Sequence, residues 1–173
     1  MGEGRPRLKA RFMAWILGMT VLLITGCGFH LRGMLEMPRW LNNMTIVLQN
    51  ASRDLEPLLT NQLKTYNIRV NPDPARTDFW LIIEEDSYHQ QMGSISSSTT
   101  PRQYQLYYTV RFKLQRSKGE KILPSTLVVV TRQITLNSDR ILGSTYEEDL
   151  SKSEMRREAV MQIIQRLSRV HEH

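Results

Sequence analysis

The feature that most constrains this fold is a strict alternation of apolar and polar side chains over residues 104–115. The apolar positions are Tyr104, Leu106, Tyr108, Val110, Phe112 and Leu114. Because successive side chains of a β-strand point to opposite faces, a period of two indicates one long strand with a buried face and a solvated face. Such a strand requires partner strands beside it and a second layer that covers its apolar face.

The neighbouring segments supply the partner strands. Residues 79–92 open with an apolar run and continue as a polar strand. Residues 122–136 form a third long strand, in which Pro124 marks an edge or a bulge. A turn at 117–120 joins the last two strands, so we expect an antiparallel meander.

Two amphipathic helices supply the second layer. The first begins at Leu55 after Asp54, a residue type that caps helix N-termini, and it ends at Asn67. The second follows a capping-box pattern at Thr145 and Glu148. Its apolar stripe consists of Leu150, Met155, Ala159, Val160, Ile163, Ile164 and Leu167.

These elements predict one α+β domain over residues 44–173. Short β-rich runs at 45–48 and 68–70 are the remaining strand candidates. We expect the two helices to pack on one face of a mostly antiparallel sheet of about four strands, which makes a two-layer sandwich.

The N-terminal segment has the pattern of a secretory signal. Four basic residues between Arg5 and Arg11 precede an apolar run at 12–24, which is shorter than the roughly 20 residues of a spanning helix. The only cysteine follows in Ile24-Thr-Gly-Cys27, which resembles a bacterial lipobox. We expect a signal peptide at 1–26, lipidation of Cys27 and a lipidated arm at 27–43. A transmembrane anchor and a buried structural cysteine are the alternatives.

The overall charge does not predict a nucleic-acid partner. A net charge of +6 and a pI near 9.7 resemble those of nucleic-acid-binding proteins. Removal of residues 1–26 would take away four of the 23 basic and one of the 17 acidic residues, which leaves a net charge of +3. Binding to nucleic acid requires a concentrated basic face and a recognisable motif, and the sequence has neither.

The sequence also lacks the usual signs of catalysis. It contains no Gly-rich phosphate loop, no G-x-S-x-G and no H-E-x-x-H. One cysteine excludes an internal disulfide and every cysteine-based zinc cluster. His171 and His173 lie in the terminal tail, and His89 has no evident nucleophile beside it. We therefore predict no enzymatic activity, no cofactor and no metal.

The segment that follows the lipobox carries a family resemblance. Cys27-Gly-Phe-His-Leu-Arg32 is similar to the mature N-terminus of the LptE (RlpB) family of lipopolysaccharide-assembly lipoproteins. Looser similarities are Asn61-Gln-Leu63, Tyr104-Gln-Leu106 and the closing helix. Gly28 stands where an Asp commonly retains such lipoproteins at the inner membrane, so the resemblance favours the outer membrane.

The resemblance implies a function that composition and spacing do not. A member of this family would bind and plug an LptD-like outer-membrane β-barrel in a 1:1 complex and assist assembly of the barrel. It would take part in lipopolysaccharide transport to the outer leaflet. It would face the periplasm, held to the outer membrane by its lipid anchor.

Two loops are the candidate contact sites under this resemblance. They span residues 91–103 and 137–144, and the meander should place them at one end of the sheet. Candidate barrel contacts are Ile95, Ser97, Ile141 and Leu142, and candidate contacts for lipopolysaccharide phosphates are Arg102, Arg132 and Arg140. Family members can carry more basic loop tips, whereas the first loop here is rich in serine. Solvated hairpins and solvated arginines are the simpler interpretation.

Two other functions remain open at this point. An accessory lipoprotein of another envelope lipid transporter would have a similar composition, and only its partner would distinguish it. A lipid-anchored hydrolase would require a pocket with a nucleophile and a base, which the sequence does not indicate.

Overall fold

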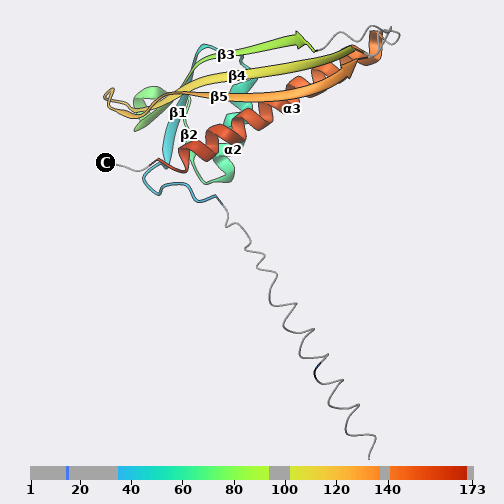
Figure 1. The fold of residues 1–173 in the computed structure, drawn as a ribbon. Helices are drawn as coiled ribbons and strands as arrows, with labels where there is room; N and C mark the ends of the chain where they lie inside the picture. The colour runs from blue at the N-terminus through green and yellow to red at the C-terminus, as the bar shows by residue number, and fades with distance from the viewer. Residues whose placement is uncertain (1–14, 16–34, 94–101, 137–140, 171–173) are drawn as a thin grey trace, which may run out of the picture. The chain divides into compact units, whose positions relative to one another are not determined.

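The computed structural model describes Trp15 and residues 35–93, 102–136 and 141–170. Residues 35–173 form one compact unit, and the description below concerns that unit. Figure 1 shows its elements as a sheet with helices beside it. The strands are β1 (Asn43–Asn50), β2 (Arg69–Val70), β3 (Phe79–Met92), β4 (Arg102–Arg116) and β5 (Lys121–Leu136). The helices are α2 (Leu55–Thr65), the short 3-10 helix η1 (Pro74–Arg76) and α3 (Ile141–Leu167).

The sheet has the strand order β2-β1-β3-β4-β5. The predicted antiparallel meander is confirmed, because β4 pairs antiparallel with both β3 and β5. The prediction of about four strands is wrong, since five strands pair. The short candidate runs at 45–48 and 68–70 both form strands, β1 and β2, and β1 runs parallel to both β2 and β3. Parallel neighbours require a crossover, which α2 provides between β1 and β2.

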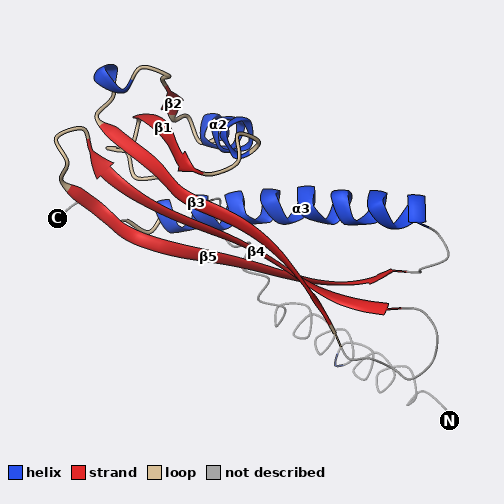
Figure 2. Cartoon of the chain, turned by 90° about the horizontal axis from the view of Figure 1, so that it is seen from above, coloured by secondary structure: helices blue, strands red, loops and turns tan. Residues whose placement is uncertain are grey.

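One face of the sheet carries the core. Both α2 and α3 lie on that side of the strands (Figure 2). The alternation in β4 is confirmed, because Leu106, Tyr108, Val110, Phe112 and Leu114 are all at most 1% exposed. Leu59 and Leu63 of α2 and Met155, Ile163 and Ile164 of α3 are fully buried against this face. Leu150 differs from its predicted place in the apolar stripe, because it is 45% exposed.

A bulge in β3 changes which residues face the helices. The pairing of β3 with β4 shifts register between Ile83 and Glu85. As a result Asp86, a charged residue, lies beside the core, where it accepts a 2.6 Å hydrogen bond from the buried Tyr108 hydroxyl. Its other oxygen accepts a 2.7 Å bond from the backbone N–H of Ser52. Burial and, after it, the bond to Asp86 raise the pKa of Tyr108 far above its usual range.

Two helix termini differ from the predictions. Asp54 precedes α2, but its side chain caps no backbone amide. Its carboxylate instead lies 2.7 Å from the guanidinium of Arg156 in α3, whose side chain is mostly buried, and this ion pair competes with capping. The second helix begins at Ile141, so Thr145 lies inside it and does not start it. None of the helices in the described ranges is long and apolar enough to cross a membrane.

Candidate functional site

The strand ends that flank the two predicted loops lie at one end of the sheet. Met92 ends β3, Arg102 begins β4, Leu136 ends β5 and Ile141 begins α3. Because β4 is antiparallel to both neighbours, these ends come together (Figure 2). We call this end of the unit the loop end. These strand ends lie together at one end of the sheet, which is where the two loops were predicted to emerge.

The predicted site residues fall into several places. Cys27, Ile95, Ser97 and Arg140 lie outside the described residues. Arg102 is the first residue of β4, where it pairs with Leu136 in register. Ile141 and Leu142 belong to the first turn of α3 and not to a loop, which corrects the prediction. Gly143 does not interrupt α3, because a glycine inside a helix lowers its stability by only about 1 kcal/mol relative to alanine.

Arg132 has a partner within the chain. Its guanidinium forms an ion pair with the Glu154 carboxylate, which joins β5 to α3. Both side chains are partly exposed, at 33% and 43%. A phosphate that bound Arg132 would have to compete with Glu154. Contact of Arg132 with a lipopolysaccharide phosphate stays a prediction, whereas its ion pair with Glu154 links β5 to α3 in the structure.

The helix and the sheet are also joined close to the loop end. The Tyr88 hydroxyl of β3 donates a 3.1 Å hydrogen bond to Glu148 of α3. Lys152 lies over the same ring, 5.0 Å from its centroid. Burial and the neighbouring Glu148 carboxylate raise the pKa of Tyr88 to about 12. The exposed large apolar side chains of the elements that reach the loop end include Met92, Tyr146 and Leu150.

The sheet face opposite the helices forms the outer surface, and most of its side chains are polar, with Leu127 and Val129 of β5 as exposed apolar residues. Within the described ranges no helix covers this outer face (Figure 2). Toward the loop end it carries hydroxyls and amides from β3, β4 and β5, which are Ser87, Gln91, Gln105, Tyr107, Thr109, Thr131, Gln133 and Thr135. Several of these groups bond one another across strands. Ser87 and Thr109 share a 2.7 Å hydrogen bond, and Gln133 donates to Gln103 at 3.1 Å.

Charged pairs occupy the other half of the outer face. Arg111 lies 3.0 Å from Glu85, and Lys113 lies 2.9 Å from Glu84. Glu84 also accepts a hydrogen bond from the Ser125 hydroxyl. That bond, together with Lys113, lowers the pKa of Glu84. The cations on this half are therefore already paired, which leaves the uncharged half as the surface better suited to hydrogen-bonding a polar partner.

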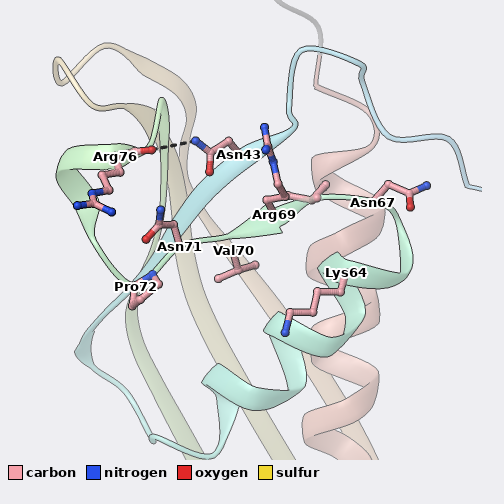
Figure 3. A pocket seen from close by; sticks show the side chains of 9 residues that line it. Asn43, Lys64, Asn67, Arg69, Val70, Asn71, Pro72 and Arg76 are labelled. Carbon is pink, nitrogen blue, oxygen red and sulfur yellow. Dashed lines mark hydrogen bonds between the residues drawn. The ribbon is translucent and has the colours of Figure 1, made fainter.

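A basic hollow lies at the opposite end of the unit from the loops. Its volume is about 710 Å³, and its lining includes Asn43, Lys64, Arg69, Asn71 and Arg76. Figure 3 shows that the three cationic side chains point in different directions. Arg76 pairs with Asp73 at 3.2 Å, and its backbone carbonyl accepts a 2.9 Å bond from the Asn43 amide. Cations that do not converge form no defined anion site, so the hollow is not the leading candidate.

We did not predict this hollow from the sequence, although several of the residues that line it stand close together in the chain. Three cations and two of the asparagines fall within residues 64–76. Their approach to Asn43 depends on the parallel pairing of β1 with β2, which the sequence did not predict. Among the described residues no group of His, Cys, Asp or Glu could hold a metal ion.

A sequence model of the LptE family, described as lipopolysaccharide assembly, matches residues 41–167. The LPS-assembly lipoprotein LptE of Pectobacterium atrosepticum is 28% identical over 161 residues, which cover 92% of this chain and 86% of that protein. The protein of the same name from Yersinia enterocolitica is 29% identical over 165 residues, covering 95% of this chain and 79% of that protein.

Solved structures share the fold. An uncharacterized lipoprotein B from Nitrosomonas europaea, solved by NMR, has a TM-score of 0.66 at 21% identity and covers 84% of this chain and 99% of its own. The rare lipoprotein B from Shewanella oneidensis has a TM-score of 0.63 at 20% identity, covering 73% and 94%. At these identities the similarity concerns the fold alone.

Proposed function

This chain belongs to the LptE family of lipopolysaccharide-assembly lipoproteins, and from that premise we propose that it binds and plugs an LptD-like outer-membrane β-barrel. The complex is 1:1, and the chain assists assembly of the barrel and takes part in lipopolysaccharide transport to the outer leaflet. Family membership agrees with the prediction that the chain is not an enzyme.

The observation that carries this proposal is the uncharged half of the outer face. The lumen of an outer-membrane barrel is polar, so its occupant must present many hydrogen-bonding groups without unpaired charge. Ser87, Thr109, Thr131 and Gln133 are such groups, and they lie on a rigid sheet. A sheet keeps these groups in fixed positions, which lowers the entropy cost of binding.

The membrane attachment is part of the same proposal. Residues 1–26 are the signal peptide, Cys27 carries the lipid, and residues 27–43 link the anchor to the domain at 44–173. More than one acyl chain on Cys27 gives stable anchoring, since each buried methylene contributes about 0.8 kcal/mol. The domain would then face the periplasm at the outer membrane.

Lipopolysaccharide contact is assigned to the loop end. Arg102 and Arg140 lie within the two predicted loop segments, 91–103 and 137–144, and arginine binds phosphate through paired N–H groups. The exposed Met92 and Tyr146 offer apolar surface in the elements that reach this end, which suits acyl chains. Charge beside apolar surface is what a phosphorylated lipid requires.

A photo-crosslinking experiment tests the barrel proposal. A photoreactive residue replaces Thr131 on the outer face, and a second variant carries it at Lys64, which is exposed on α2. After irradiation in cells, the outer membrane is extracted and the products are identified by mass spectrometry. We expect one barrel protein to be captured from position 131 and little from position 64. Equal capture from both positions would remove the outer face from the proposal.

The second candidate gives a different result in the same experiment. If the chain is an accessory lipoprotein of another envelope lipid transporter, its photoreactive residue would capture a component of that transporter and no barrel protein. Affinity purification of the wild-type chain measures the molar ratio of the chain to the co-purified barrel. A departure from equimolar amounts would contradict the 1:1 complex.

A further inference from the structure

The last strand of the sheet has an open edge. β5 is the terminal strand in the order β2-β1-β3-β4-β5, and it pairs with β4 along one side only. In the described part of the chain no strand pairs with its other side (Figure 2). The strand runs from Lys121 to Leu136, so a long row of backbone N–H and C=O groups faces outward.

The centre of this edge lacks the features that usually prevent pairing. Native edge strands are protected by charged side chains, prolines, bulges or short length. Residues 125–131 read Ser-Thr-Leu-Val-Val-Val-Thr, with no charge and no proline. Leu127 and Val129 point to the outer face and are 42% and 44% exposed. The segment is therefore β-prone, partly apolar and open.

We propose that two copies of this chain pair antiparallel through the β5 edge, with Val128 at the two-fold axis. In this register Leu127 lies opposite Val129 of the second copy, and Ser125 lies opposite Thr131. Two apolar pairs are thereby flanked by two pairs of hydroxyl side chains. The regular part of the uncharged segment, residues 126–131, therefore meets uncharged residues of the second copy.

The charged residues of β5 support the same register. Arg132 falls opposite the stretch of the second copy between Leu123 and Thr126, where the pairing of β5 shifts register and no cation stands. No cation then faces another cation, which would destabilise a strand pair. The Arg132 guanidinium is held toward α3 by Glu154, so it does not lie across the edge. The two-fold axis places the helices of both copies on the same side of the joined sheet.

Electron–electron distances between spin labels test the register. Residues 35–173 form a compact unit that contains the whole described core and no cysteine, so single labels can be placed in it. Two labels at Thr131 are separated by the strand length from 125 to 131, about 20 Å at ~3.4 Å per residue. Two labels at Thr135 are separated by the length from 121 to 135, about 48 Å. A contact through any other surface would not give this pair of distances.

A charge variant tests the edge itself. Val129→Lys places a cation in the centre of the strand pair and should weaken dimerisation about tenfold or more in sedimentation. His89→Lys is the matched control, because it adds the same charge to the same face on β3, away from the edge. The control should dimerise like the wild type.

Three results would overturn this proposal. These are a wild-type unit that stays monomeric at high concentration, label distances that do not fit the register, and equal effects of the two lysine variants. The experiment uses the chain without a barrel, so its failure would leave the proposed function untouched.

Discussion

At the scale of single residues, the side chain of Glu84 shows how a bulge creates a charged site. The register shift between Ile83 and Glu85 leaves Glu84 on the outer face, within reach of Ser125 and Lys113. The bond from Ser125, and then Lys113, favours the charged carboxylate and lowers its pKa from the ordinary value near 4.5. A lowered pKa in the folded state means that the stabilisation is complete above pH 4.5 and is lost as the pH falls through the folded value.

The pH dependence of stability should therefore change when this carboxylate is removed. We expect Glu84→Gln to lower the free energy of unfolding at pH 7 and to flatten its decrease below pH 4.5, as measured by urea denaturation across that range. Glu147→Gln removes an exposed carboxylate outside this cluster and serves as the control. An unchanged acid-side slope in Glu84→Gln would show that the ion pair and hydrogen bond contribute nothing.

A second residue-scale prediction concerns the end of α2. Asn67 has a φ of 60°, in the left-handed region, and the N–H of Ile68 closes the helix on the Leu63 carbonyl at 3.1 Å. Asparagine adopts the left-handed conformation more readily than alanine, because its short polar side chain can form local hydrogen bonds. We expect Asn67→Ala to destabilise the unit by about 1 kcal/mol, whereas Asn67→Gly leaves stability nearly unchanged. Equal denaturation midpoints for the two variants would contradict the backbone argument.

At the scale of elements, the sequence predicted long periodic segments well and pairing poorly. Residues 79–92 were predicted as a strand with the bounds that β3 has, and the alternation in β4 identified its buried face. The parallel pairing of β1 with β3 and β2 was not predicted, because strand order and direction are tertiary properties that the side-chain period of each strand does not determine. The start of α3 was placed late, since a capping-box pattern can also occur inside a helix.

The predicted stripe of α3 gives an element-scale test. Ile163 is fully buried against the sheet, whereas Met161 on the same helix is 36% exposed. Ile163→Ala removes buried methyl groups and leaves a cavity, so it should lower the free energy of unfolding by about 2–5 kcal/mol. Met161→Ala should cost about 0.5 kcal/mol or less. Similar decreases in the free energy of unfolding for both variants would mean that α3 does not pack on the sheet through the face that contains Ile163.

At the scale of the whole molecule, the family was identified by residues that lie outside the domain. The Cys27–Arg32 opening carried the resemblance, and the family match over residues 41–167 confirms it from a different part of the chain. The candidate contacts were less predictable. Arg132 could be recognised as an exposed cation from sequence, but its pairing with Glu154 requires that α3 pack beneath β5, which is a tertiary property.

The division between a loop end and the rest of the unit leads to the last prediction. If Arg102 and Arg140 bind lipopolysaccharide phosphates, reversing both charges replaces attraction by repulsion at that end alone. We expect Arg102→Glu with Arg140→Glu to weaken binding of purified lipopolysaccharide about tenfold, which corresponds to ~1.4 kcal/mol. Arg157→Glu, at an exposed position of α3, changes the net charge of the chain elsewhere and should have little effect. Comparable weakening by Arg157→Glu would attribute binding to overall charge, and unchanged binding in the double variant would remove both arginines from the site.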